Sequence, residues 1–71
     1  MTNTKLLAEW IEKSGKKKSY LAEKCGLSRQ GFYLKCINEQ EFTVSEVNIL
    51  CAELNITTLR DKETIFFANR M

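Results

Sequence analysis

The stretch SYLAEKCGLSRQGFYLKCIN, residues 19–38, decides the fold expected of this chain. Ala22 is small enough to let two crossing helices approach closely, and Gly26 can adopt the positive φ that a sharp turn requires. Ser28 is a favourable N-cap for the helix that follows this turn. Two helices that meet at roughly a right angle through a short glycine turn form a helix-turn-helix. The stretch therefore predicts such a motif at about residues 18–38.

The rest of the chain predicts further helices on both sides of this motif. Apolar residues recur at helical spacing, and Thr43 and Glu46 have the spacing of a capping box. Helices are expected at about residues 3–14, 18–25, 28–38 and 43–55, the second with Ser19 as its cap. The segment 58–69 is expected to form a helical turn or a docked arm, with the apolar residues 65–67 completing the core or binding a partner. Residues 1–71 are thus predicted to form a single compact all-α domain of four or five helices.

The composition excludes several classes of protein. Of the 71 residues 44% are hydrophobic and none is proline, which suffices for one small core and argues against disorder. No stretch approaches the roughly 20 apolar residues that a membrane span needs. The polar start of the sequence does not have the pattern of a signal peptide. We therefore expect a cytoplasmic protein.

No arrangement of residues in the sequence is typical of a catalytic or metal site. There are three cysteines, no CxxC pair and no histidine, so the ligands of a structural zinc site are missing. Each cysteine falls within an apolar periodicity and is interpreted as a small hydrophobic residue, with a redox or metal role as the alternative. No nucleophile–base pair and no Gly-rich phosphate loop is present. We expect no enzyme activity, no metal, no cofactor and no small-molecule ligand.

Charge is unevenly distributed along the sequence. Residues 13–35 contain seven basic residues and one acid, a net charge of +6, whereas residues 41–71 contain three basic residues and five acids, a net charge of −2. A basic face is typical of a nucleic-acid binder. The alternative is a solvated lysine-rich surface without a partner.

The pattern LAxxxGLSRQ over residues 21–30 resembles the signature of the helix-turn-helix family of phage repressors and Cro-type (XRE-like) regulators. The resemblance continues through FTxxE at residues 42–46 and covers nearly the whole chain. It implies a lambda-repressor-like fold. The ending ExIFFA, residues 63–68, resembles small Cro-like proteins of temperate phages of Gram-positive hosts. That group includes modulators of repression, which are antirepressors that bind the lysogeny repressor itself.

The resemblance also implies roles for particular residues. The residues expected to read bases or bind a partner are Ser28, Arg29, Gln30 and Tyr33. Those expected to contact phosphates are Lys17, Lys18, Ser19 and Lys35, and those expected to anchor a protein interface are Phe32 and Leu34. The chemistry suits the first set, because Gln can form two hydrogen bonds to adenine and Arg two to guanine. The alternative is that these are ordinary exposed polar residues on an inherited fold.

Two positions depart from the family pattern. The loop at residues 38–41 carries two acids where the family has Gly and Lys near the DNA backbone, and carboxylates repel phosphates. Gly31 lies inside the third helix, where glycine costs up to about 1 kcal/mol relative to alanine. Both departures favour a surface that meets a protein.

The function expected first is that of a Cro-like regulator of a phage genetic switch in the cytoplasm of a bacterial host, and an antirepressor is the alternative. The Cro-like regulator reads operator DNA with its third helix. The antirepressor binds the N-terminal, DNA-binding domain of the lysogeny repressor and blocks its operator binding. A weak homodimer is an option in either case, through Val44, Ile49 and residues 65–67.

Overall fold

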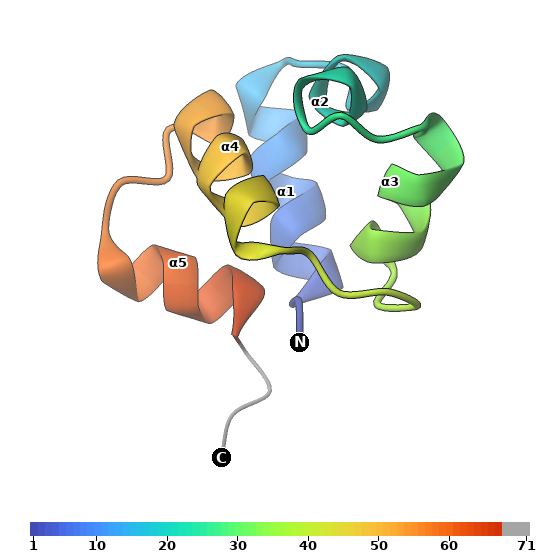
Figure 1. The fold of residues 1–71 in the computed structure, drawn as a ribbon. Coiled ribbons are helices and arrows are strands. Elements are labelled where there is room, and N and C mark those ends of the chain that lie inside the picture. The colour runs from blue at the N-terminus through green and yellow to red at the C-terminus, as the bar shows by residue number, and fades with distance from the viewer. Residues whose placement is uncertain (68–71) are drawn as a thin grey trace.

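The computed structural model describes residues 1–67, and this part of the chain consists of five helices without a strand. The helices are α1 (Thr4–Ser14), α2 (Lys18–Lys24), α3 (Arg29–Cys36), α4 (Val44–Leu54) and α5 (Leu59–Phe66). They pack around one interior, with α2 and α3 on one side of α4 and α5 on the other (Figure 1). The predicted all-α architecture is confirmed. The end of the fifth predicted segment, residues 68 and 69, lies outside the described residues.

Short side chains fix where four of these helices begin. Each of them accepts a hydrogen bond from a backbone N–H in the first turn of its helix, which satisfies a group with no partner inside the helix. These capping residues are Asn3, Ser28, Thr43 and Thr58. At Thr43 the capping box is complete, because Glu46 also accepts from the backbone N–H of Thr43 at 3.0 Å.

The start of α2 differs from the prediction. Lys17 is its N-cap and makes no side-chain capping bond, so the expected capping role of Ser19 is wrong. Ser19 lies one residue inside the helix and is exposed. The backbone of Lys17 is already extended, with φ −80° and ψ 147°, and the helix begins at Lys18. A helix capped by Ser19 would begin two residues later, at Tyr20.

The core collects apolar side chains from every helix. Its buried members are Leu7, Ile11, Leu21, Ala22, Phe32, Val47, Leu50, Cys51, Leu54, Ile56, Ile65 and Phe66. A row of aromatic rings joins α3 to α5: Phe42 makes edge-to-face contacts with Phe32 at 6.1 Å and with Phe66 at 5.8 Å between ring centroids. Such contacts add to the stabilisation that comes from burying the rings.

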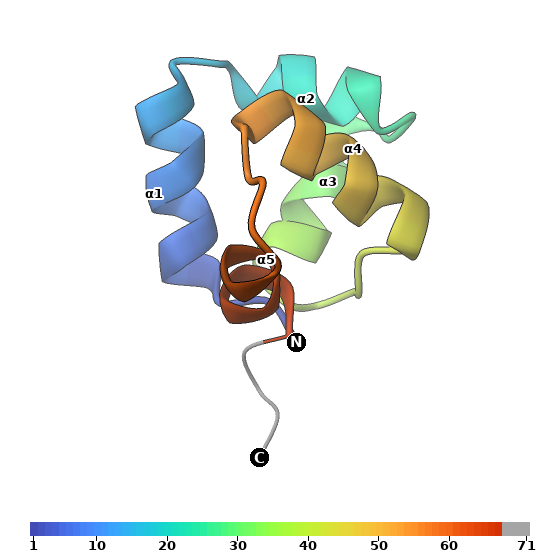
Figure 2. The ribbon, with the colours of Figure 1, turned by 90° about the vertical axis from the view of Figure 1, so that its left-hand side faces the viewer.

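The last segment is a helix and not an extended arm. Ile65 and Phe66 are buried, so they complete the core, whereas Phe67 is 47% exposed. The N–H of Asn3 donates to the carbonyl oxygen of Ile65 at 2.6 Å, which ties the N-terminal segment to α5 (Figure 2). No helix within residues 1–67 is long and apolar enough to cross a membrane.

Candidate recognition surface

A tight turn places α3 beside α2. Gly26 has φ +74°, and the N–H of Leu27 donates to the carbonyl oxygen of Ala22 at 2.9 Å, which closes the end of α2. Leu27 packs against the core at the corner of the turn. Ser28 then caps α3 through its Oγ, which accepts from the N–H of Gly31 at 3.0 Å. The outer side of α3 is left uncovered by the other helices (Figure 1).

The four residues predicted to read bases or bind a partner are all exposed: Ser28, Arg29, Gln30 and Tyr33. Three of the predicted phosphate contacts, Lys17, Lys18 and Ser19, are exposed at the start of α2. A hollow of about 470 Å³ between α2 and α3 is lined by Lys17, Lys18 and Ser19 together with Arg29 and Tyr33, whereas Ser28 and Gln30 do not line it. Lys17, Lys18 and Arg29 give its edges positive charge, while Phe32, Tyr33 and Cys36 give it apolar walls. We use the term recognition surface for the exposed residues of the two predicted sets together with Ile37. These are Lys17, Lys18, Ser19, Ser28, Arg29, Gln30, Tyr33 and Ile37.

Cys36 contributes an apolar wall to this hollow. Burial raises the pKa of its thiol to about 11, against a smaller opposing effect of Lys18. The thiol is therefore neutral at physiological pH and is a poor nucleophile. This fits the interpretation of Cys36 as a small hydrophobic residue.

Lys35 does not lie with the other predicted phosphate contacts. It follows Phe32 by three residues and so points to the inner side of α3, where its Nζ lies 2.6 Å from Oε1 of Glu46. The two side chains are only 11% and 12% exposed. Burial raises the pKa of Glu46, but hydrogen bonds from Lys35 and Thr43 outweigh this and hold the pKa below its ordinary value. The charge of Lys35 is therefore neutralised inside the molecule, and we withdraw its assignment to phosphate binding.

The predicted protein anchors are also placed differently. Phe32 is 2% exposed because it forms part of the core, so its assignment as an interface anchor is wrong. Leu34 is half-buried. An apolar residue that the sequence reasoning did not select, Ile37, is 40% exposed and lies one helical turn beyond Tyr33, which is 56% exposed. The exposed face of α3 is thus polar in its first turn and apolar toward its end.

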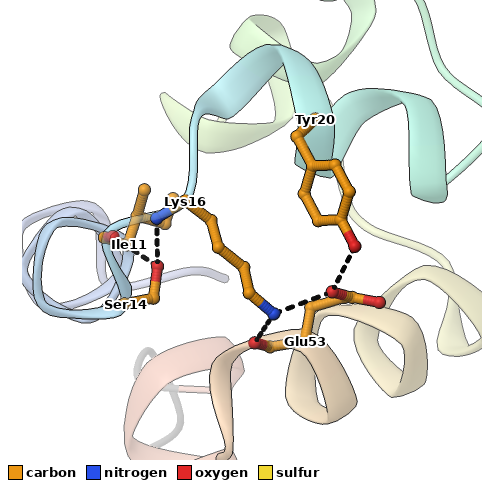
Figure 3. A network of polar contacts seen from close by, with 5 residues as sticks. All are labelled: Ile11, Ser14, Lys16, Tyr20 and Glu53. Carbon is orange, nitrogen blue, oxygen red and sulfur yellow. Dashed lines mark hydrogen bonds and ion pairs between the residues drawn. The ribbon is translucent and has the colours of Figure 1, made fainter.

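A polar network fixes the loop that leads into α2. Nζ of Lys16 donates to Oε1 of Glu53 at 2.9 Å and to the backbone oxygen of Glu53 at 2.8 Å, and the hydroxyl of Tyr20 donates to the same carboxylate at 3.1 Å (Figure 3). The hydrogen bond from Lys16 is the main reason why the pKa of Glu53 is lowered. On the other side of the loop, Oγ of Ser14 accepts from the N–H of Lys16 at 3.1 Å. Lys16 therefore positions the two lysines that follow it.

The loop after α3 places negative charge at the C-terminal end of this helix, opposite in sign to the charge beside its first turn. Glu39 and Glu41 are both exposed, and residues 37–43 contain no basic residue. This loop therefore carries negative charge without a cation of its own, whereas Lys17, Lys18 and Arg29 lie beside the first turn of α3. Gly31 has a local explanation, because a Cβ there would lie 3.1 Å from Oγ of Ser28 and would crowd the helix cap.

Comparisons of the chain with protein-family models, curated proteins and solved structures give no match. Within residues 1–67, no group of three or more His, Cys, Asp or Glu side chains could hold a metal ion. The recognition surface is therefore the feature from which a function can be inferred.

Proposed function

We propose that the chain is a helix-turn-helix antirepressor of a phage genetic switch, which binds the DNA-binding domain of the lysogeny repressor through its recognition surface. The observation that carries this proposal is the apolar half of that surface. Tyr33 on α3 and Ile37, the residue that follows this helix, are exposed one helical turn apart, and Tyr33 lines the apolar-walled hollow. Exposed tyrosine and arginine next to a pocket are typical of the centres of protein interfaces.

The charges around α3 also favour a protein over DNA. A recognition helix in the major groove lies between two phosphate strands, so carboxylates near either strand weaken binding. Here Glu39 and Glu41 occupy the loop at the C-terminal end, and the nearby Lys35 is paired with Glu46 inside the molecule. Phosphates at this end would meet the two exposed carboxylates of the loop. A protein partner, in contrast, can present cations to these two carboxylates.

The antirepressor would then act by steric exclusion. A complex that covers the recognition helix of the repressor leaves that helix unable to enter the operator. No chemical step is needed, and the effect depends only on the concentrations and on the relative affinities of the repressor for the antirepressor and for DNA.

The Cro-like alternative is favoured by one specific observation. Arg29 and Gln30 are exposed in the first turn of α3, where base edges are read, and Lys17 and Lys18 lie beside them. In this alternative the chain binds the operator directly and competes with the repressor for DNA.

Competition on labelled operator DNA distinguishes the two functions. The fluorescence anisotropy of the labelled operator is measured with repressor bound, while the chain is titrated in. An antirepressor lowers the anisotropy to the value of free DNA, because it removes the repressor and does not bind the DNA. A Cro-like regulator leaves the anisotropy above that value and raises it when added to DNA alone.

A further inference from the structure

A second hollow, of about 130 Å³, lies between α1 and α3. Its outer edges are formed by Thr4 and Ala8 of α1 on one side and by Tyr33 and Ile37 on the other. The buried side chains of Leu7 and Ile11 form its floor, so this hollow is largely apolar.

The two hollows adjoin, because Lys18, Tyr33 and Cys36 line both of them. Together they form a groove, which we call the joint groove, that crosses the recognition surface from α2 to α1. Its two ends differ in chemistry. Lys17, Lys18 and Arg29 surround the end beside α2, whereas Lys18 is the one charged residue among those lining the hollow beside α1.

We propose that the joint groove binds a segment of the partner protein that presents carboxylates to the α2 end and an aliphatic or aromatic side chain to the α1 end. This inference rests on the proposed function, since it takes the partner to be a protein. It extends the interface from α3 to the face of α1 that carries Ala8. It also means that the cations of the recognition surface bind acidic side chains of the partner and not phosphates.

Charge complementarity selects this occupant. Three cations around an open hollow attract carboxylates, and desolvation on binding strengthens that attraction. The apolar end offers no charged group beyond Lys18 to pair with a phosphate, so a nucleic-acid backbone would leave it unfilled. An apolar side chain seated there would remove Tyr33 and Ile37 from water, which stabilises the complex in proportion to the apolar area covered.

Two pairs of matched variants test the proposal by isothermal titration with the N-terminal domain of the repressor as the probe. Ala8→Gln obstructs the apolar end of the groove, and Ala52→Gln makes the same change at an exposed alanine of α4. Lys17→Glu reverses a charge of the groove, and Lys13→Glu reverses one on α1 that does not line either hollow. We expect Ala8→Gln and Lys17→Glu each to raise the Kd about tenfold. Both controls should stay within about twofold of the unaltered chain.

If the repressor domain binds but the groove variants behave like their controls, the joint groove is not the interface, although the antirepressor function stands. If Lys17→Glu tightens the complex, the occupant is basic and the proposal is overturned. If the repressor domain does not bind at all, the proposed function fails.

A second measurement then tests the groove on its own. The probe is a short peptide, acetyl-Asp-Glu-Leu-Trp-Asp-Leu-amide, titrated into the isotope-labelled chain. The expected result is a set of amide shift changes confined to residues around the joint groove, Ala8, Lys18, Tyr33 and Ile37 among them, which disappears in Ala8→Gln. Shift changes absent from these residues, or a dimer of the chain that Lys17→Glu dissociates, would overturn the assigned occupant.

Discussion

Lys35 and Glu46 form an ion pair between α3 and α4, with 2.6 Å between Nζ and Oε1 and with both side chains nearly buried. The same carboxylate accepts the N–H of Thr43 in the capping box of α4. The side chain of Glu46 therefore caps α4, binds the neighbouring helix α3 and neutralises Lys35, which was expected on the surface. The pair determines which cations remain exposed on α3.

Removal of the Glu46 carboxylate should destabilise the fold strongly. Glu46→Ala leaves the charge of Lys35 unpaired in a nearly buried position, which costs about 3 kcal/mol in the free energy of unfolding. Glu46→Gln should cost less, because the amide oxygen can still accept from the N–H of Thr43. Urea unfolding followed by circular dichroism measures both. Glu12→Ala, at an exposed position of α1, is the control, and a loss in Glu46→Ala no larger than in this control would show that the ion pair is unimportant.

Stability should fall in acid through the same residue. Because the pKa of Glu46 in the folded protein lies below its ordinary value of 4.5, folding favours the ionised carboxylate. The stabilisation is therefore complete above that ordinary value and is lost as the pH falls further. Thermal melts between pH 7 and pH 3 should show a smaller loss of Tm in Glu46→Gln than in the unaltered chain. Parallel curves for the two proteins would contradict this account.

Gly26 should be sensitive to substitution for conformational reasons alone. A Cβ at this position meets no atom within 4 Å, but φ is +74°, so alanine is strained by about 1 kcal/mol. For a chain of this size the strain corresponds to a fall in Tm of about 5 °C. Gly15→Ala is a matched control, since Gly15 has φ +72° and likewise no neighbour within 4 Å. Both variants should lose similar stability, and only Gly26→Ala should also weaken partner binding, because only Gly26 orients α3. Equal partner binding by the two variants would contradict the role of that turn.

The apolar residue after α3 should contribute more to binding than to stability. Ile37→Ala removes a side chain that is 40% exposed, so the Tm should fall by about 5 °C while the affinity for the repressor domain falls about tenfold. Val44→Ala is the control, because Val44 is 76% exposed and lies on α4. Surface plasmon resonance with immobilised repressor domain gives both affinities. If the two variants bind alike, α3 does not bind the repressor through this residue.

Features that depend on short-range chemistry were predictable from the sequence. The caps at Ser28 and Thr43, the turn at Gly26 and the extent of α1 follow from local backbone and side-chain preferences, and the structure confirms them. The expected cap at Ser19 failed because Lys17 is the extended residue before α2, so that Ser19 already lies within the helix.

The recognition surface was predictable only in part, because it depends on how helices face one another. Lys35 was assigned to phosphate contact through the family resemblance, although its spacing from Phe32 places both on one face of α3. Ile37 was not selected from the sequence, and packing against α1 and α2 leaves it more exposed than Cys36. The joint groove is formed by three helices, so no single segment of sequence indicates it.

The most direct test of the central claim is size-exclusion chromatography with light scattering on three samples: the chain alone, the chain with the N-terminal domain of the neighbouring repressor, and the chain with operator DNA. We predict a stoichiometric complex with the repressor domain that forms without DNA, and no stable complex with the operator. A stable complex with the operator and none with the repressor domain would contradict the antirepressor function and identify a Cro-like operator binder.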